Sequence, residues 1–220
     1  MVGDIEAIKA IQVDWEIDAV AITTHDGIDD LDSKLDRKTV TTGCGQGTVF
    51  GDLMEDIDKI SLPRPRLRQS SIYALLNALN EYNEIYKNAG AVHGCALCSE
   101  TAGIEQFIED VGRHNAVDAV AGHMWLHRTP GDDKLFYTTG RLTSEMVIKV
   151  AQMGIPVLLS RSGITQMGLE LAQRVGVTLI ARAKGRHFLV YTGAGRITFD
   201  AVPDRVRPAE RRPHLEAGVG

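Results

Sequence analysis

The chain has 220 residues, 44% of them hydrophobic and 24% charged, which is typical of a globular protein large enough to bury a core. Its formal net charge of −5 argues against nucleic acid as a partner, and no apolar run approaches the ~20 residues of a membrane span. Three cysteines and no visible secretory signal predict a reducing cytoplasm, not a secreted disulfide framework.

The N-terminal part contains few predicted elements before residue 70. An apolar run over residues 17–22 predicts a strand, and residues 26–38 are turn-forming and charged. Residues 41–48 (TTGCGQGT) hold three glycines in five positions, which predicts a loop. A basic connector with two prolines, residues 61–68, leads into a helix. Ser70 is its predicted N-cap, and apolar residues at helical spacing extend from Ile72 to Tyr86.

From about residue 90, short apolar runs alternate with amphipathic segments. We predict strands over residues 104–108, 135–137, 157–159, 177–180 and 188–191, and helices over 112–125, 144–153 and 165–175. This alternation predicts an α/β fold, with helices on the faces of a sheet. We assign residues 1–89 to an N-terminal part, 90–200 to a ligand-binding α/β core and 201–220 to a mobile tail.

Three of the predicted strands end in a short polar loop that a helix follows at once. The loops are residues 109–115 (EDVGRHN), 138–141 (TTGR) and 160–163 (SRSG). Ligands of open α/β sheets bind at the carboxyl ends of strands, where helix N-termini and arginines favour phosphate. The predicted contacts to a phosphate-bearing ligand are Arg113, Asn115, Thr139, Gly140, Arg141, Ser160, Arg161 and Ser162. Alternatively, the hydroxyl groups cap helices and the arginines are solvated charges; no standard nucleotide fingerprint is present.

Cys44 lies between two glycines of the predicted loop. Because glycines add no side-chain bulk, its sulfur can be exposed and can approach a large partner. Backbone N–H groups of such a loop can also stabilise a thiolate or a persulfide. These features favour a reactive thiol over a buried one.

The other two cysteines form the motif His93-Gly-Cys95-Ala-Leu-Cys98. This spacing could bring two thiolates and an imidazole to one Zn²⁺, as in a zinc-dependent hydrolase. No second cysteine pair closes a four-thiolate site, and the signature of zinc deaminases is not met. Packing of both thiols in an apolar stretch is therefore the favoured interpretation.

His114 lies at a predicted helix start, one helical turn before Asp118. The carboxylate of Asp118 could fix the tautomer of His114 and make it a proton shuttle. The alternative is a hydrogen-bond network at a helix start, with no chemistry.

Residues 109–118 (EDVGRHNAVD) resemble the signature of the formate dehydrogenase accessory sulfurtransferase family (FdhD). Other segments match in order: residues 90–93, 139–141, 144–146, 154–157, 160–162, and 177–180 through 184–186 to 191–192. The resemblance extends over roughly residues 40–197.

The resemblance implies a three-layer α/β/α fold similar to that of cytidine deaminases, in which a mixed sheet carries helices on both faces without the zinc site. It implies a cytoplasmic sulfurtransferase that accepts persulfide sulfur from a cysteine desulfurase. The sulfur would pass to the molybdenum or tungsten bis-molybdopterin guanine dinucleotide cofactor, for insertion into formate dehydrogenase. That cofactor would be the phosphate-bearing cargo, guanine nucleotides would occupy the same site, and a homodimer is expected.

The resemblance also suggests roles for individual residues. Cys44 would carry the persulfide, and His114, oriented by Asp118, would manage protons. The basic stretch Arg182, Lys184, Gly185 and Arg186 would add phosphate contacts. A chaperone that binds the cofactor without transferring sulfur is the second interpretation.

Two features depart from the family pattern. Gly47 stands where the family usually has a second loop cysteine, which leaves Cys44 as the one thiol of this loop. Family members also usually carry several tens of residues before the position of Met1, which suggests a truncated chain or a late-assigned start. Cys95 and Cys98 lie where the family typically has small residues, so the resemblance gives them no role.

Overall fold

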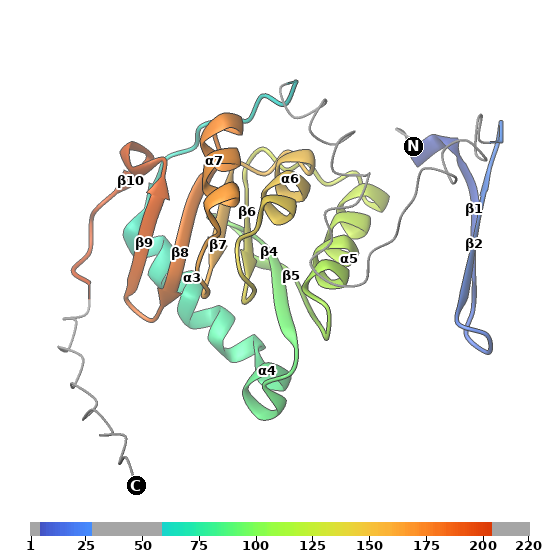
Figure 1. Ribbon diagram of the computed structural model, residues 1–220, viewed down its shortest axis with the longest axis horizontal. Helices are drawn as coiled ribbons and strands as arrows, with labels where there is room; N and C mark the ends of the chain where they lie inside the picture. Colours follow the sequence, from blue (N-terminus) through green and yellow to red (C-terminus); the bar gives the residue numbers. More distant parts are fainter. Residues whose placement is uncertain (1–4, 28–58, 204–220) are drawn as a thin grey trace, which may run out of the picture.

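The computed structural model describes residues 5–27 and 59–203, and its largest element is a six-stranded sheet of order β5-β4-β6-β7-β8-β9 (Figure 1). Its strands are β4 (His93–Ser99), β5 (Gly103–Asp110), β6 (Lys134–Thr138), β7 (Val157–Ser160), β8 (Thr178–Lys184) and β9 (His187–Thr192). Two smaller sheets pair β1 (Ile8–Asp14) with β2 (Ala19–Thr24), and β3 (Leu67–Arg68) with β10 (Ile197–Thr198). Short 3₁₀ helices span Ile5–Ala7 and Ala194–Arg196.

The strand directions in the large sheet are mixed. Strands β6, β7 and β8 pair in parallel, whereas β4 is antiparallel to both β5 and β6, and β9 is antiparallel to β8. As a result β5, β6, β7 and β8 all run in one direction. Their carboxyl ends meet at the same edge of the sheet, which we call the loop edge.

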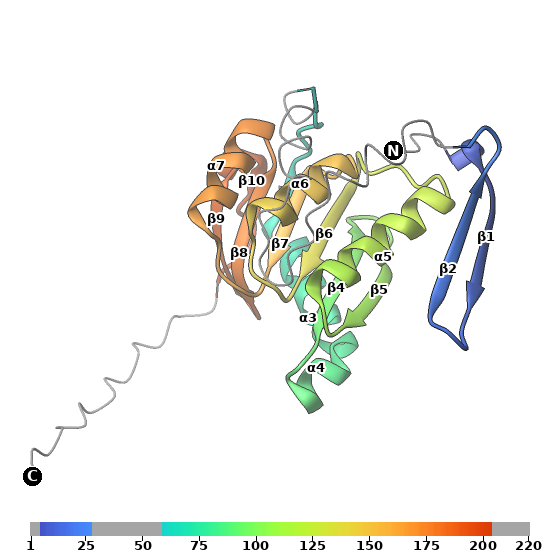
Figure 2. The same ribbon diagram turned by 45° about the vertical axis from the view of Figure 1, so that its right-hand side comes forward.

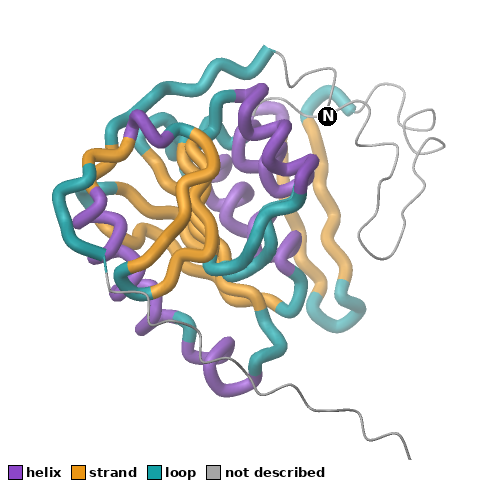
Figure 3. The backbone as a smooth tube through the Cα atoms, turned by 60° about the vertical axis from the view of Figure 1, so that its left-hand side comes forward, coloured by secondary structure: helices purple, strands orange, loops and turns teal. Residues whose placement is uncertain are grey.

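Helices cover both faces of this sheet (Figures 2 and 3). Helices α5 (Arg113–Leu126), α6 (Ser144–Gln152) and α7 (Gln166–Val175) pack on one face. Helix α3 (Gln69–Tyr82) packs on the other, and the short α4 (Glu84–Ala89) follows it. The predicted α/β fold with helices on both faces of a mixed sheet is confirmed, and likeness to cytidine deaminases stays an expectation.

The alternation of side chains along the strands separates two apolar cores. Cys95, Leu97 and Phe136 face the cluster of α5, α6 and α7, while Cys98 and Tyr137 face the cluster of α3. Because β6 and β7 are almost fully buried on both faces, they contain the continuous apolar runs 135–137 and 157–159 instead of alternating apolar and polar residues.

Most strands and helices predicted from residue 100 onward lie within one to four residues of the observed elements. The predicted strand over residues 17–22 is in fact the second half of a hairpin whose first strand is β1. The predicted helix through Tyr86 is broken at Asn83, whose ψ of 55° leaves the helical region and separates α3 from α4.

Ser70 is not the N-cap of α3; Arg68 takes that position without a side-chain cap. Ser70 lies inside the first turn, where its backbone N–H and its hydroxyl group donate to the carboxylate of Asp200 at 2.9 and 2.7 Å. A carboxylate from a distant part of the chain therefore satisfies the helix start, which local sequence alone does not indicate. No helix in the described residues is long and apolar enough to cross a bilayer.

Candidate functional site

The three predicted loops are neighbours along the loop edge. The backbone N–H of Thr139 donates to Gly94 O (2.9 Å), that of Arg161 to Thr138 O (3.2 Å), and that of Arg182 to Ser162 O (2.9 Å). These bonds continue the pairing of the sheet beyond the strand ends. The structure therefore brings residues 109–115, 138–141 and 160–163 together, as the sequence predicted.

The first loop is held by its own side chains. The Oδ1 atom of Asp110 accepts hydrogen bonds from the backbone N–H of Gly112 (2.7 Å) and from Nδ2 of Asn115 (3.1 Å). This arrangement fixes the turn from β5 into α5. The amide of Asn115, a predicted ligand contact, thus donates one hydrogen bond within the loop.

The hydroxyl groups of the second and third loops also bond within the protein. Thr139 Oγ1 accepts from Gly94 N (3.0 Å), and Ser160 Oγ donates to Gly140 O (2.6 Å) while accepting from Ser162 N (2.9 Å). Both side chains are buried. We conclude that they fix the shape of the loops, which is closer to the capping alternative than to direct ligand contact.

Arg161 contributes to a cavity of about 200 Å³ at the loop edge, on the α3 face of the sheet. Lys184 and Gly185 lie in the same cavity, so three of the predicted contacts do come together. The guanidinium carbon of Arg161 lies 5.5 Å from the centre of the Tyr86 ring, within the range of a cation–π contact. The cavity therefore presents two cationic groups.

The same cavity is lined by Tyr137, Asn77 and Asn80, which the sequence analysis missed. Burial raises the pKa of Tyr137 to about 12, so its hydroxyl group stays protonated and can donate a hydrogen bond. The two asparagines are three residues apart on α3 and therefore lie on the same side of the helix, in and directly after the mainly apolar stretch of residues 72–79. That polar pair is the signal that could have indicated them.

The remaining basic residues do not all converge on this cavity. Arg186 lies with its guanidinium carbon 5.6 Å from the ring centre of Tyr73 on α3. Arg182 has a left-handed backbone conformation (φ 51°) at an irregularity in the pairing of β8 with β9, and its side chain is exposed. Arg141 is exposed in the second loop.

Two histidines lie beside Arg113 at the start of α5. Burial, followed by the charge of Arg113, lowers the pKa of His93. Burial also lowers the pKa of His114, with Arg113 acting in the same direction against the carboxylate of Glu145. The Nδ1 atoms of both imidazoles are buried and form no hydrogen bond within the described residues. The lowered pKa values favour the neutral form of each ring, and one nitrogen of each ring has no hydrogen-bond partner within the described residues.

The predicted pairing of Asp118 with His114 is not observed. Both carboxylate oxygens of Asp118 accept from Lys149 Nζ, at 2.7 and 2.8 Å, across the contact between α5 and α6. The carboxylate close to the imidazole is that of Glu145, whose Oε2 lies 3.2 Å from His114 Nε2. Helical spacing places Asp118 within reach of His114, but the ammonium group from the neighbouring helix is the stronger partner.

Cys95 and Cys98 point to opposite faces of the sheet, and both are fully buried. Two thiolates on opposite faces cannot bind one zinc ion, so the zinc-hydrolase alternative is wrong and the packing interpretation is confirmed. Burial raises the pKa of each thiol to about 12. Residues 5–27 and 59–203 contain no cluster of three potential metal-binding side chains. Cys44 and Gly47 lie outside the described residues.

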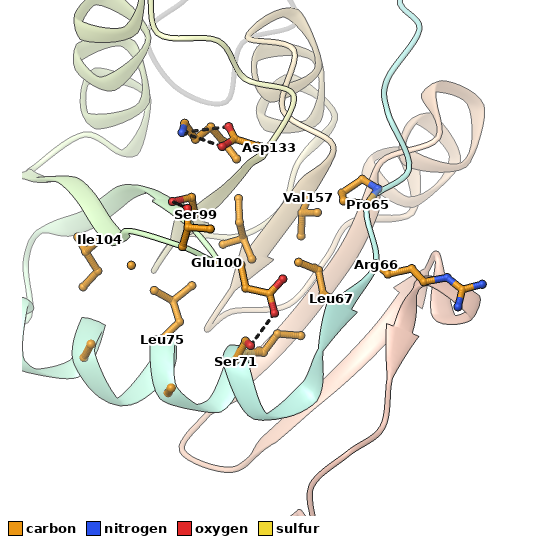
Figure 4. Close-up of a pocket in the computed structure, with 17 residues that line it drawn as sticks. Pro65, Arg66, Leu67, Ser71, Leu75, Ser99, Glu100, Ile104, Asp133 and Val157 are labelled. Carbon is orange, nitrogen blue, oxygen red and sulfur yellow. Dashed lines mark hydrogen bonds and ion pairs between the residues drawn. The ribbon is translucent and has the colours of Figure 1, made fainter.

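A larger cavity of about 510 Å³ lies at the opposite edge of the sheet, where β5, β6 and β7 begin (Figure 4). Its walls are largely apolar and include Leu67, Ile72, Leu75, Ile104, Leu135 and Val157. Lys134 Nζ lies 3.0 Å from both Glu105 Oε1 and Asp133 Oδ1, and Ser71 Oγ donates to Glu100 Oε1 at 2.7 Å. The carboxylates of Glu100 and Asp133 line this cavity, whereas no carboxylate among the described residues lines the smaller cavity at the loop edge.

Comparison with known proteins decides the family. A family model described as the FdhD/NarQ family matches residues 1–198. The chain belongs to this family. The resemblance of the loop-edge motifs to FdhD proteins is thereby confirmed.

Individual FdhD relatives agree with this assignment. A sulfur carrier protein FdhD from Wolinella succinogenes is 32% identical over 91% of this chain and 70% of its own length. One from Sulfurisphaera tokodaii is 35% identical over 76% of this chain and 65% of its own. One from Bacillus pumilus is 30% identical over 76% of this chain, which spans only 63% of that relative. A solved structure from Desulfotalea psychrophila, described as a formate dehydrogenase accessory protein, is 28% identical with a TM-score of 0.68, covering 89% of this chain and 73% of its own.

Proposed function

We propose that this protein is a cytoplasmic sulfurtransferase that carries persulfide sulfur to a phosphate-bearing molybdenum or tungsten cofactor required by formate dehydrogenase. The names of its relatives support two parts of this proposal. The name sulfur carrier protein FdhD supports the transfer of sulfur, and the name formate dehydrogenase accessory protein supports the link to formate dehydrogenase. The observation that carries it is the loop edge, where Arg161 and Lys184 share a cavity with hydrogen-bond donors.

The cationic cavity supports a ligand with phosphate groups. A guanidinium group binds phosphate oxygens in a bidentate manner, and a lysine ammonium adds a point charge. The protonated hydroxyl group of Tyr137 and the amides of Asn77 and Asn80 can donate or accept further hydrogen bonds. We therefore assign the bis-molybdopterin guanine dinucleotide cofactor, bound as cargo, to the loop edge, and expect free guanine nucleotides to compete for the same place.

Sulfur transfer to the protein needs one thiol and no oxidant. The thiolate of Cys44 attacks the outer sulfur of a desulfurase persulfide, forming the Cys44 persulfide and releasing the desulfurase cysteine as a thiolate. The absence of a second loop cysteine at Gly47 is compatible with this exchange, because no resolving thiol takes part. Release of the outer sulfur as sulfide to the cargo then takes two electrons from a thiol reductant.

The two histidines and the acidic groups beside them suit proton management near the cargo. His114 is neutral and can accept a proton as charge develops, and Glu145 next to it would stabilise the resulting imidazolium. Asp118 does not pair with His114 directly; it holds the ammonium group of Lys149 on the neighbouring helix. Arg113 lies against Gly140, where it would bring a further cation to the cargo.

The first experiment separates sulfur transfer from simple cofactor binding. The wild-type chain, incubated with a cysteine desulfurase and cysteine, is expected to gain the mass of one sulfur atom, and Cys44→Ala is expected not to gain it. Guanosine diphosphate should raise the melting temperature of both proteins equally. A wild-type chain that binds the nucleotide but acquires no persulfide would establish the chaperone interpretation instead.

The second experiment tests the place of the cargo. Arg161→Leu should weaken guanosine diphosphate binding about tenfold by calorimetry, because it removes a charged hydrogen-bonding group from the cavity. Arg68→Leu is the matched control, since Arg68 pairs with Glu100 at the opposite edge of the sheet. Equal affinities for Arg161→Leu and the wild type would contradict the assignment. The proposal also includes a homodimer.

A further inference from the structure

The first loop of the loop edge begins with Glu109, a half-buried residue that has no part in the proposed function. Glu109 Oε1 accepts a hydrogen bond from the backbone N–H of Tyr86 (2.9 Å), and Oε2 accepts one from that of Ile85 (3.2 Å). Both N–H groups belong to the first turn of α4, where a helix has no carbonyl oxygen of its own to offer. A carboxylate on β5 therefore caps α4 from the sheet.

A second anchor fixes the other side of this turn. Asn83, which separates α3 from α4, is fully buried, and its Nδ2 donates to Leu79 O at 2.6 Å. A Cβ at Gly94 would lie only 2.5 Å from Asn83 Oδ1, so a glycine at the start of β4 is needed to admit the amide. The contacts at Asn83 and Glu109 together hold α4 against β4 and β5 (Figures 1 and 2).

The anchored helix carries the aromatic ring that lies against Arg161. Tyr86 and Arg161 are both half-buried, and the guanidinium carbon lies over the ring at 5.5 Å from its centre. A cation–π contact strengthens when its two groups are withdrawn from water. The ring contacts a face of the guanidinium group, whereas the N–H donors lie in its plane. The contact therefore orients Arg161 without using the donors that phosphate oxygens require.

We propose that Tyr86 and Glu109 are positioning residues for the cargo site. Tyr86 orients the guanidinium group of Arg161 towards the phosphate groups, and Glu109 keeps Tyr86 in place by capping α4. This inference rests on the proposed function, because it deepens the assignment of the cargo to the cavity of Arg161 and Lys184. An arginine loses rotamer freedom when it binds phosphate, and an arginine already held by a ring loses less. The expected result is a higher affinity for the cargo.

The first test compares two tyrosines that lie four residues apart. Tyr86→Leu should weaken guanosine diphosphate binding about fivefold by calorimetry, whereas Tyr86→Phe keeps a ring and should stay within about twofold of the wild type. Tyr82→Leu is the matched control, since the Tyr82 ring lies 5.5 Å from the ring of Phe107 instead and its loss should leave the affinity unchanged. In an Arg161→Leu background, Tyr86→Leu should have no further effect.

Two substitutions of Glu109 separate capping from charge. Glu109→Gln and Glu109→Leu both remove the negative charge, but only glutamine keeps an oxygen that can accept from the N–H groups of α4. Loss of a carboxylate favours binding of an anion, so a purely electrostatic role predicts tighter and equal binding for both variants. Capping predicts instead that Glu109→Leu binds guanosine diphosphate about threefold more weakly than Glu109→Gln.

The orientation of Arg161 can also be measured without a ligand. An aromatic ring shifts the NMR signals of protons over its face upfield, and Arg161→Leu identifies the Nε–Hε signal of Arg161 by its loss. Tyr86→Leu and Glu109→Leu should move this signal downfield, while Tyr86→Phe and Tyr82→Leu should leave it in place. A loss of global stability alone would not move the signal of the folded protein.

Each outcome bears on a different part of the reasoning. Equal affinities for Tyr86→Leu and the wild type, or an unmoved Arg161 signal in Tyr86→Leu, would overturn the inference while leaving the cargo assignment intact. Equal affinities for Glu109→Leu and Glu109→Gln would overturn the role of Glu109. A wild-type chain that does not bind guanosine diphosphate would overturn the cargo assignment itself, whereas the Arg161 signal would still decide whether Tyr86 orients the guanidinium group.

Discussion

Replacing Cys44 by alanine leaves only two thiols, which the structure places in the interior of the sheet. Burial raises the pKa of Cys95 and Cys98 to about 12, from an ordinary value near 9.0. The thiolate fraction at pH 8 then falls from about 10⁻¹ to about 10⁻⁴, and thiolates are the reactive form. We expect the native Cys44→Ala protein to react with Ellman's reagent at least ~1,000-fold more slowly than a free cysteine.

The assay follows reagent colour before and after denaturation. Native Cys44→Ala should show no fast phase, and two equivalents of thiol should appear on unfolding in urea. The wild type should show one additional equivalent under native conditions if Cys44 is accessible. A fast phase from native Cys44→Ala would refute the reasoning, because it would mean that the interior thiols ionise or open readily.

The same shifts predict a loss of stability at alkaline pH. The thiol pKa values are raised on folding, so the unfolded chain loses its protons first as pH increases above about 9. The two buried, protonated thiols therefore contribute fully to the stability of the folded protein below about pH 9, and this contribution is lost progressively as the pH rises towards 12. At pH 10 each thiol lowers the free energy of unfolding by about 1.4 kcal/mol, or about 3 kcal/mol for the pair. Removing Cys98 by alanine should halve that pH dependence in urea titrations.

Three further predictions concern packing and charge. Gly131→Ala should lower the free energy of unfolding measured in urea by about 2 kcal/mol, because an added Cβ would overlap a neighbouring carbonyl oxygen. Gly122→Ala is the control: Gly122 lies on α5 with open space around it, so this change should be neutral or stabilising. The pKa values of His93 and His114 are lowered in the folded protein, so the unfolded chain binds protons first as the pH falls below about 6.5. The free energy of unfolding should therefore decrease on acidification. Replacing both histidines by glutamine should flatten the pH dependence of the free energy of unfolding between pH 7 and 5. Ser160→Ala removes two buried hydrogen bonds that hold the loops and should cost about 1–3 kcal/mol, with weaker guanosine diphosphate binding; unchanged melting and binding would contradict its role in loop shape.

Local sequence pattern was sufficient for the elements of the C-terminal half. Helices such as α7 have a hydroxyl N-cap at Thr165 and a left-handed glycine at Gly176, and these signals act within a few residues. The apolar runs of β6 and β7 were recognisable because buried parallel strands are uniformly apolar. The loops that follow them were predictable for the same reason, since a strand must end where glycine and polar residues begin.

Strand β4 was missed because His93–Ser99 carries small residues and two cysteines without a clear period. Its place between β5 and β6 depends on pairing with segments that lie further along the chain. That pairing also decides that Cys95 and Cys98 face opposite cores, which removes the metal site that their spacing suggested. A spacing of three residues gives proximity on a helix or in a loop, but in a strand it gives opposite faces.

At the candidate site, the sequence determined which residue types are present and that three loops gather at one sheet edge. Only the tertiary structure decided which side chains face the cavity: Tyr137 from a strand and Asn77 from a helix join Arg161, whereas the hydroxyl of Ser160 turns inward. The partner of Asp118 was likewise decided by the neighbouring helix, through Lys149. The physical reason is one of range: burial periodicity and capping act between residues close in sequence, while hydrogen bonds and ion pairs form with whatever group the packed chain brings within about 3 Å.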